Sequence, residues 1–241
     1  MADTPAAPQQ RRRRSARAAK LAMWAAAAYL LVAYFTLPAF WLLHDRDRAP
    51  ADFLTTTTDG IPGDPINISL IGSEEDVIRA FAAARWNAAD PITLSSSVEI
   101  GLDVVLDRRY LDAPVSTLLF DGRRQDLAFE KPSGTSPDKR HHVRLWLDAN
   151  AGANERPTWF GAASYDRGVG VSHFTGQITH HIDPDLDAER DFVISDLAKA
   201  GHVVSTETID GIGPVENGVN GGGDRYFTDG MILRTVLTPS S

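Results

Sequence analysis

Two pairs of adjacent histidines are the residues of this sequence most able to do chemistry. His141 and His142 lie in KRHHVRLWL, and His180 and His181 lie in QITHHID. Both segments have the composition of β-strands, in which successive side chains point to opposite faces. Each pair therefore directs one histidine toward an apolar face and the other toward a polar face. This alternation places His142 and His181 on the polar side, where they could converge if the two strands pair.

A carboxylate joins the two polar histidines in this arrangement. The strand that precedes the second pair adds Ser164 and Asp166 to the polar face by the same alternation. Imidazole and carboxylate groups together can transfer protons or bind zinc, manganese or iron. We predict His142, His181 and Asp166 as catalytic groups, and His142, His181 and Asp183 as ligands of a divalent metal. No HExxH-type spacing accompanies them.

Three arginines near the histidines support a second interpretation. Arg140, Arg144 and Arg167 could bind phosphate or another anion through paired N–H groups, while a protonated histidine supplies acid catalysis. A third interpretation is structural, with one histidine of each pair hydrogen-bonded in the core and the others on the surface. The sequence leaves all three open.

Acidic residues at alternate positions follow the second histidine pair, namely Asp183, Asp185, Asp187, Glu189 and Asp191. They could form a cation site, but they also begin a predicted helix. The helix dipole stabilises each exposed acid there by roughly 0.3–1 kcal/mol, so a structural role is expected for most of them. We predict that Asp183 caps this helix, with Pro184 in its first position, and Asp183 could also bind a metal.

The rest of the pattern predicts two further helices and a series of short strands. Ser73 caps the first of these helices, and the second covers residues 96–107. The helix that follows Asp183 ends before Gly201. Gly, Pro, Asp and Ser separate predicted strands at residues 66–71, 118–120, 126–130, 140–147, 158–166, 176–182, 203–209 and 231–237. The Gly- and Asn-rich loop 213–224 is expected to be mobile. These elements predict an α+β fold with a mostly antiparallel sheet and helices packed on one face.

One uncharged stretch, residues 21–43, precedes that domain. About 20 apolar residues cross a hydrocarbon core of roughly 30 Å, so this segment predicts one transmembrane helix that contacts the lipid bilayer. Its apolar length exceeds the 7–15 residues usual in a cleaved signal peptide, and no clean Ala-x-Ala site follows. We therefore expect a disordered basic tail at 1–20, a linker at 44–63 and one domain at 64–238.

Charge fixes the expected orientation and excludes one class of partner. Residues 1–20 carry a net charge of +5, so the N-terminus is expected in the cytoplasm and the domain in the periplasm, at a bacterial inner membrane. The whole chain carries −8 and has no cysteine, which excludes disulfides and thiolate metal sites. An acidic domain argues against nucleic acid, whose binding requires Lys and Arg.

Several long blocks resemble one known family. They are GDPINISLIGSEEDVIRAF, ARWNAADPITLSSS, APVSTLLFDGRRQDLAFEKP, SPDKRHHVRLW, WFGAASYDRGVG and TGQITHHIDPDLDAERDFVISDLAKAG. Together they are similar, over residues 63–201, to the LssY-like C-terminal domain family. The resemblance implies a bacterial envelope-associated domain, which in some members is joined to membrane phosphatase-like or DedA-like modules. That context suggests lipid or phosphate chemistry by association and assigns no catalytic residue.

Two functions follow as hypotheses. The first is an envelope-associated binding or accessory module for a lipid, a phosphate ligand or a membrane protein. The alternative is a metal- or histidine-dependent hydrolase of an envelope phosphoester or lipid, with a divalent metal as the expected cofactor. The sequence favours the first, because no nucleophile and base stand at a recognised spacing.

Overall fold

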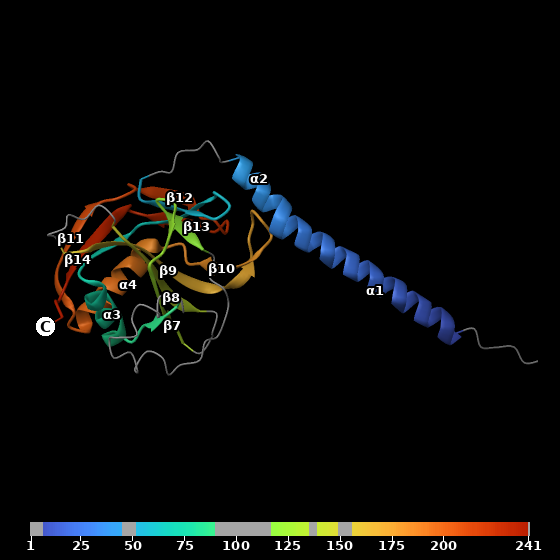
Figure 1. The fold of residues 1–241 in the computed structure, drawn as a ribbon, viewed down its shortest axis with the longest axis horizontal. Helices are drawn as coiled ribbons and strands as arrows, with labels where there is room; N and C mark the ends of the chain where they lie inside the picture. The colour runs from blue at the N-terminus through green and yellow to red at the C-terminus, as the bar shows by residue number, and fades with distance from the viewer. Residues whose placement is uncertain (1–6, 45–51, 90–116, 135–138, 149–155, 241) are drawn as a thin grey trace, which may run out of the picture.

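A long N-terminal helix and one α+β domain make up the chain (Figure 1). The computed structural model describes residues 7–44, 52–89, 117–134, 139–148 and 156–240. The helix is continuous through α1 (Ala7–Leu31), the π-helical turn η1 (Val32–Thr36) and α2 (Leu37–His44). Leu37 donates its N–H to the carbonyl of Val32, five residues earlier, as in a π-helix. Pro38 follows directly, and its ring clashes with the carbonyl four residues before it in a regular α-helix.

One segment of the described residues, Ala16–His44, is long and apolar enough to cross a membrane. This finding agrees with the predicted transmembrane helix. The helix starts at Ala7, so residues 7–20 are helical, where a disordered tail was expected. Alanine, glutamine and arginine have high helix propensity, and a helix already formed beyond residue 20 extends easily through them.

The largest sheet has eight strands and confirms the predicted fold class. Its order is β11-β14-β3-β9-β8-β7-β4, with β10 also paired to β9. All of its pairs are antiparallel except β14 with β3. The strands are β3 (Ile68–Ile71), β4 (Asn87–Ala88), β7 (Leu127–Pro132), β8 (Arg140–Leu147), β9 (Thr158–Val171), β10 (Ile178–Ile182), β11 (Val203–Asp210) and β14 (Met231–Leu237).

Two helices, α3 (Glu74–Ala83) and α4 (Leu186–Lys199), cover one face of this sheet. Val77 and Phe81 of α3 and Val193 of α4 pack with strand residues in the main core. Ser73 caps α3 as predicted, in a reciprocal capping box with Asp76. Burial alone would raise the pKa of Asp76, but its hydrogen bonds, including that from Arg156, lower it overall.

A small second sheet covers part of the opposite face. Its order is β2-β1-β5-β6, from β1 (Leu54–Thr57), β2 (Pro62–Pro65), β5 (Leu118–Phe120) and β6 (Arg123–Arg124). The expected linker 44–63 therefore contains β1 and the start of β2. Gly63 permits this pairing, because a Cβ there would lie only 2.5 Å from the Thr55 hydroxyl. A buried Thr55 Oγ1 donates to the Asp64 carbonyl at 2.6 Å.

Other predicted elements differ from the structure at their ends. The expected mobile loop 213–224 contains β12 (Val215–Val219), which pairs with β13 (Arg225–Thr228). The cap of α4 is Asp185, whose side chain accepts the Ala188 N–H, and not the predicted Asp183. The Asp183 side chain instead accepts the Asp185 N–H, in the turn that precedes the helix. The limits predicted for the strands now labelled β5, β8 and β14 are confirmed. The predicted helix 96–107 lies outside the described residues.

Candidate functional site

The two faces of β8 have the alternation that the sequence predicts. Val143 and Leu145 pack in the core under the helices, whereas Trp146 packs on the other face with Ile66 and Leu118. His141 points to the helix side, where its ring stacks on Phe192 at 3.9 Å.

His141 is a structural residue. Its Nδ1 lies 2.8 Å from Glu189 Oε2 of α4. Burial raises the pKa of Glu189, and the bond from His141 opposes that rise. This contact ties α4 to the sheet, as expected for the histidine on the apolar face.

Arg140 is the centre of a buried ion network on the other face. Its guanidinium donates to Asp166 at 3.0 Å and to Glu130 at 2.7 Å. A third contact, at 3.2 Å, joins it to His180 Nε2. Burial raises the pKa of Glu130, and the charge of Arg140 opposes that rise. The predicted anion ligand Arg140 is thus occupied by two carboxylates.

Arg144 lies on the same buried face of β8, four residues after Arg140. Its Nη1 is 3.8 Å from Asp64 Oδ2, and Asn220 donates to the other Asp64 oxygen at 3.2 Å. Burial raises the pKa of Asp64, while Arg144 and the Asn220 bond lower it. The carboxylate contact of Arg144 is thus longer than those of Arg140.

His142 lies between these two arginines and is only 1% exposed. Neither ring nitrogen has a hydrogen-bond partner among the described residues. Burial, followed by the charges of Arg144, Arg140 and His180, lowers the pKa of His142 well below its usual value. The ring is therefore neutral at pH 7. The face expected to be a polar surface is in fact enclosed.

The structure places His180, and not His181, beside Asp166. His180 Nδ1 lies 3.5 Å from Asp166 Oδ2. The register of β9 with β10 shifts at this point, since His181 lies opposite Gly168 but Ile182 lies opposite Asp166. Arg167 is the extra residue of this bulge, and it reverses which side of β10 faces the network.

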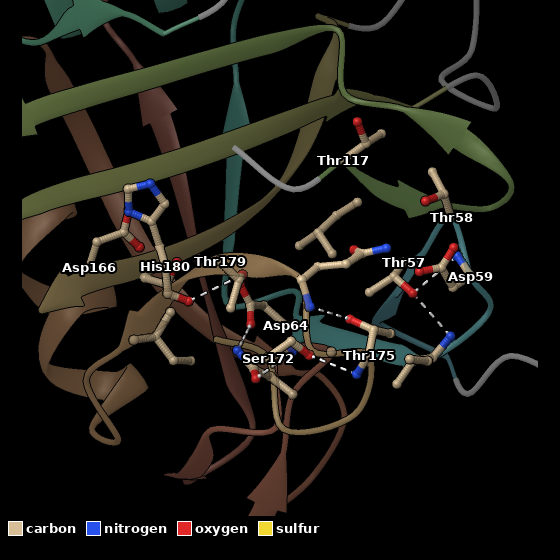
Figure 2. Close-up of a pocket in the computed structure, with 18 of the residues that line it drawn as sticks. Thr57, Thr58, Asp59, Asp64, Thr117, Asp166, Ser172, Thr175, Thr179 and His180 are labelled. Carbon is tan, nitrogen blue, oxygen red and sulfur yellow. Dashed lines mark hydrogen bonds and ion pairs between the residues drawn. The ribbon is translucent and has the colours of Figure 1, made fainter. Parts of the chain in front are cut away.

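A cavity of about 230 Å³ opens beside this network. Figure 2 shows His180 next to Asp166 at one end, with hydroxyl side chains of β1 and of the β9–β10 turn around the rest. Arg144, Asp59, Asp64 and Asp166 supply its charged lining. Its other polar lining residues are Thr57, Thr58, Thr117, Ser164, Ser172, Thr175, Gln177, Thr179, His180 and Asn220.

A family model described as LssY C-terminus matches residues 46–232. The chain belongs to the LssY C-terminus family. The match starts after the long helix and reaches β14, so it includes the second sheet and the whole cavity lining. No curated protein and no solved structure matches the chain.

A second cluster of the LssY C-terminus domain lies near the cavity and could hold a metal. His173, His181 and Asp224 each offer one ligand atom, all within 4.8 Å of one another. His181 Nδ1 contacts Asp224 Oδ1 at 2.8 Å, and the Arg167 guanidinium lies 3.7 Å from the same oxygen. Of the predicted metal ligands, only His181 belongs to this set. Asp183 is instead engaged with Asp185.

Two glycines make room for this cluster. A Cβ on Gly170 would lie 2.2 Å from His181 Nε2, and one on Gly223 would lie 2.5 Å from the His173 Cβ. Asp64, Asn220 and Asp224 are the polar residues that sequence reasoning missed. The sequence marks these residues only weakly, because each lies in a short segment with glycines where polar and apolar residues do not alternate.

Proposed function

We propose that this LssY C-terminus protein is a membrane-anchored binding module, with its domain on the outer side of a bacterial inner membrane. Its cavity would bind a small polar headgroup that carries hydroxyls and one anionic group. The observation that carries this proposal is the lining, which combines Arg144 with buried carboxylates and many hydroxyls beside the long apolar helix. The orientation follows from the basic residues before that helix.

The charge balance of the cavity suggests the ligand class. Arg144 can meet an anionic oxygen, since guanidinium groups bind phosphate strongly. Asp59, Asp64 and Asp166 would repel a bare phosphate, but their oxygens can accept hydrogen bonds from ligand hydroxyls. A glycerol phosphodiester satisfies both requirements, and a volume of about 230 Å³ suits a headgroup without its acyl chains.

Removing the Arg144 charge is expected to weaken headgroup binding at least tenfold. We would measure binding of phosphatidylglycerol and phosphatidylcholine to the detergent-solubilised full chain by native mass spectrometry. The wild type should retain one phosphatidylglycerol in preference to phosphatidylcholine, and Arg144→Gln should lose this preference. Loss of one charge-assisted contact, worth about 1.5–3 kcal/mol, supports this size of effect.

The controls separate binding from folding. Arg234→Gln removes an arginine that pairs with Glu207 on the exposed part of β11 and should bind as the wild type does. If Arg144→Gln does not fold, Thr179→Val can be compared with Thr206→Val, because only Thr179 lines the cavity. Equal retention of both lipids by the wild type would refute the proposal.

A metal-dependent hydrolase is the second candidate, favoured by the set of His173, His181 and Asp224. Two imidazoles and one carboxylate are the ligands of several catalytic zinc sites. We expect the full chain, purified with zinc and dialysed, to retain one ion per molecule and His181→Ala to retain none. The half-buried His202 supplies the control, His202→Ala. A metal-free wild type would exclude this candidate.

A further inference from the structure

The turn between β9 and β10 packs directly on the apolar helix. The Tyr29 hydroxyl donates to the Gly176 carbonyl at 2.7 Å, and the Trp41 indole donates to the Phe174 carbonyl at 3.3 Å. Between them, Ala33 is almost fully buried, and a Cβ on Gly176 would lie 3.6 Å from its methyl group. The turn therefore contacts the helix between Tyr29 and Trp41, and Figure 1 shows the tip of this hairpin against the helix.

These contacts lie at membrane depth. The uncharged stretch has 23 residues, Leu21–Leu43, and a span needs about 20 of them. At most about three can lie outside the hydrocarbon, so Tyr29 and Ala33 cannot. The turn that contacts them must then enter the bilayer with them.

The backbone hydrogen bonds of the turn are compatible with a position inside the bilayer. Every N–H group from Ser172 to Ile178 donates a hydrogen bond within the protein. Ser172 alone accepts three of them, two through its hydroxyl and one through its carbonyl. Irregular backbone is tolerated at membrane depth only when its polar groups are satisfied by protein. A loop in water has no such requirement.

Apolar side chains flank the turn and face outward. Val169, Val171 and Ile178 share one face of the hairpin, since Ile178 lies opposite Val171. They are 42%, 53% and 65% exposed. They form an exposed apolar patch next to a helix that is itself largely exposed, and lipid would cover both.

We infer that the β9–β10 turn, residues 171–178, is inserted beside the anchor helix to about the middle of the bilayer, because Tyr29 and Ala33 lie near the centre of the 21–43 stretch. The inference rests on the orientation in the proposed function and deepens it. Ser172, Thr175 and Gln177 of this turn also line the cavity. The insertion thus places this side of the cavity next to the bilayer, which contains the proposed ligand.

The test uses single cysteines, which are unique because the chain has none. Ile178→Cys and Val204→Cys form a matched pair, since their wild-type side chains are 65% and 63% exposed. Val204 lies on β11, on the side of the domain away from the helix (Figure 1). Spheroplasts expressing either full chain would be treated with a membrane-impermeant maleimide. We expect at least fivefold less labelling of Ile178→Cys, with Val171→Cys protected in the same way.

Each outcome has a separate meaning. Equal labelling of Val204→Cys and Ile178→Cys overturns the inference but leaves the outward orientation intact. No labelling of Val204→Cys without lysis overturns the orientation, and with it the proposed function. To show that lipid gives the protection, an environment-sensitive dye on Ile178→Cys in proteoliposomes should be quenched by doxyl-labelled lipids. Protection without quenching would indicate a protein partner and would also overturn the inference.

Discussion

Replacing Arg140 by methionine is expected to destabilise the domain by about 3–5 kcal/mol, the usual cost of breaking a buried ion pair from one side. The guanidinium contacts Asp166 at 3.0 Å and Glu130 at 2.7 Å, and the Asp166 side chain is only 4% exposed. The methionine variant leaves the buried Asp166 carboxylate without its partner. The desolvation penalty of that unpaired charge exceeds the net contribution of the ion pair to stability.

Urea unfolding of the detergent-solubilised full chain would measure this loss. Arg234→Met is the matched control, since its pair with Glu207 is 3.5 Å long and exposed, and such pairs contribute about 0–1 kcal/mol. The double variant Arg140→Met, Asp166→Leu should recover much of the loss, because it removes the stranded charge. Equal effects of Arg140→Met and Arg234→Met would contradict the ion network.

The second large effect concerns pH and His142. The pKa of this buried histidine is lowered in the folded domain, so the unfolded chain binds its proton first as pH falls. Its contribution to stability is therefore fully present above the unfolded pKa of about 6.5 and is lost below it. The loss cannot exceed about 1.4 kcal/mol per pH unit, which limits it to about 1.6 kcal/mol between pH 6.5 and 5.

His142→Leu removes this proton uptake. We expect the variant to lose less stability than the wild type between pH 6.5 and 5, by up to about 1.6 kcal/mol, measured by urea unfolding at each pH. Burial raises the pKa of Asp64, Glu130 and Glu189, so these groups act in the opposite direction and weaken stability as pH rises above about 4. The comparison between variant and wild type isolates His142. Parallel pH profiles would show that the ring is solvated or paired.

The sequence predicted those parts of the fold that depend on local patterns. Alternation fixed the faces of β8, and Ser73 followed by acids marked the start of α3. The second sheet was missed because β1 and β2 are short and rich in threonine, glycine and proline, which are also typical of a linker. Their strand identity depends on distant partners such as Leu118 and Leu119 of β5.

The candidate site was predicted less well for two physical reasons. Alternation placed Arg140, His142, Arg144 and Asp166 on one face, which the structure confirms. It placed His181 there as well, but the extra Arg167 in β9 brings His180 to that face instead. A bulge leaves no signature in the residues around it. The burial of this face could not be predicted either, because the second sheet that covers it was not recognised in the sequence.

The parallel pairing of β14 with β3 has a consequence for folding during synthesis. β3 lies between β9 and β14, yet β14 is the last strand of the described chain. While the ribosome makes the chain from its N-terminus, β3 keeps an open edge until residues 231–237 are synthesised. Open edges invite pairing with other chains. Completion of this sheet must therefore wait for those residues, and a holding chaperone would be of use during that interval.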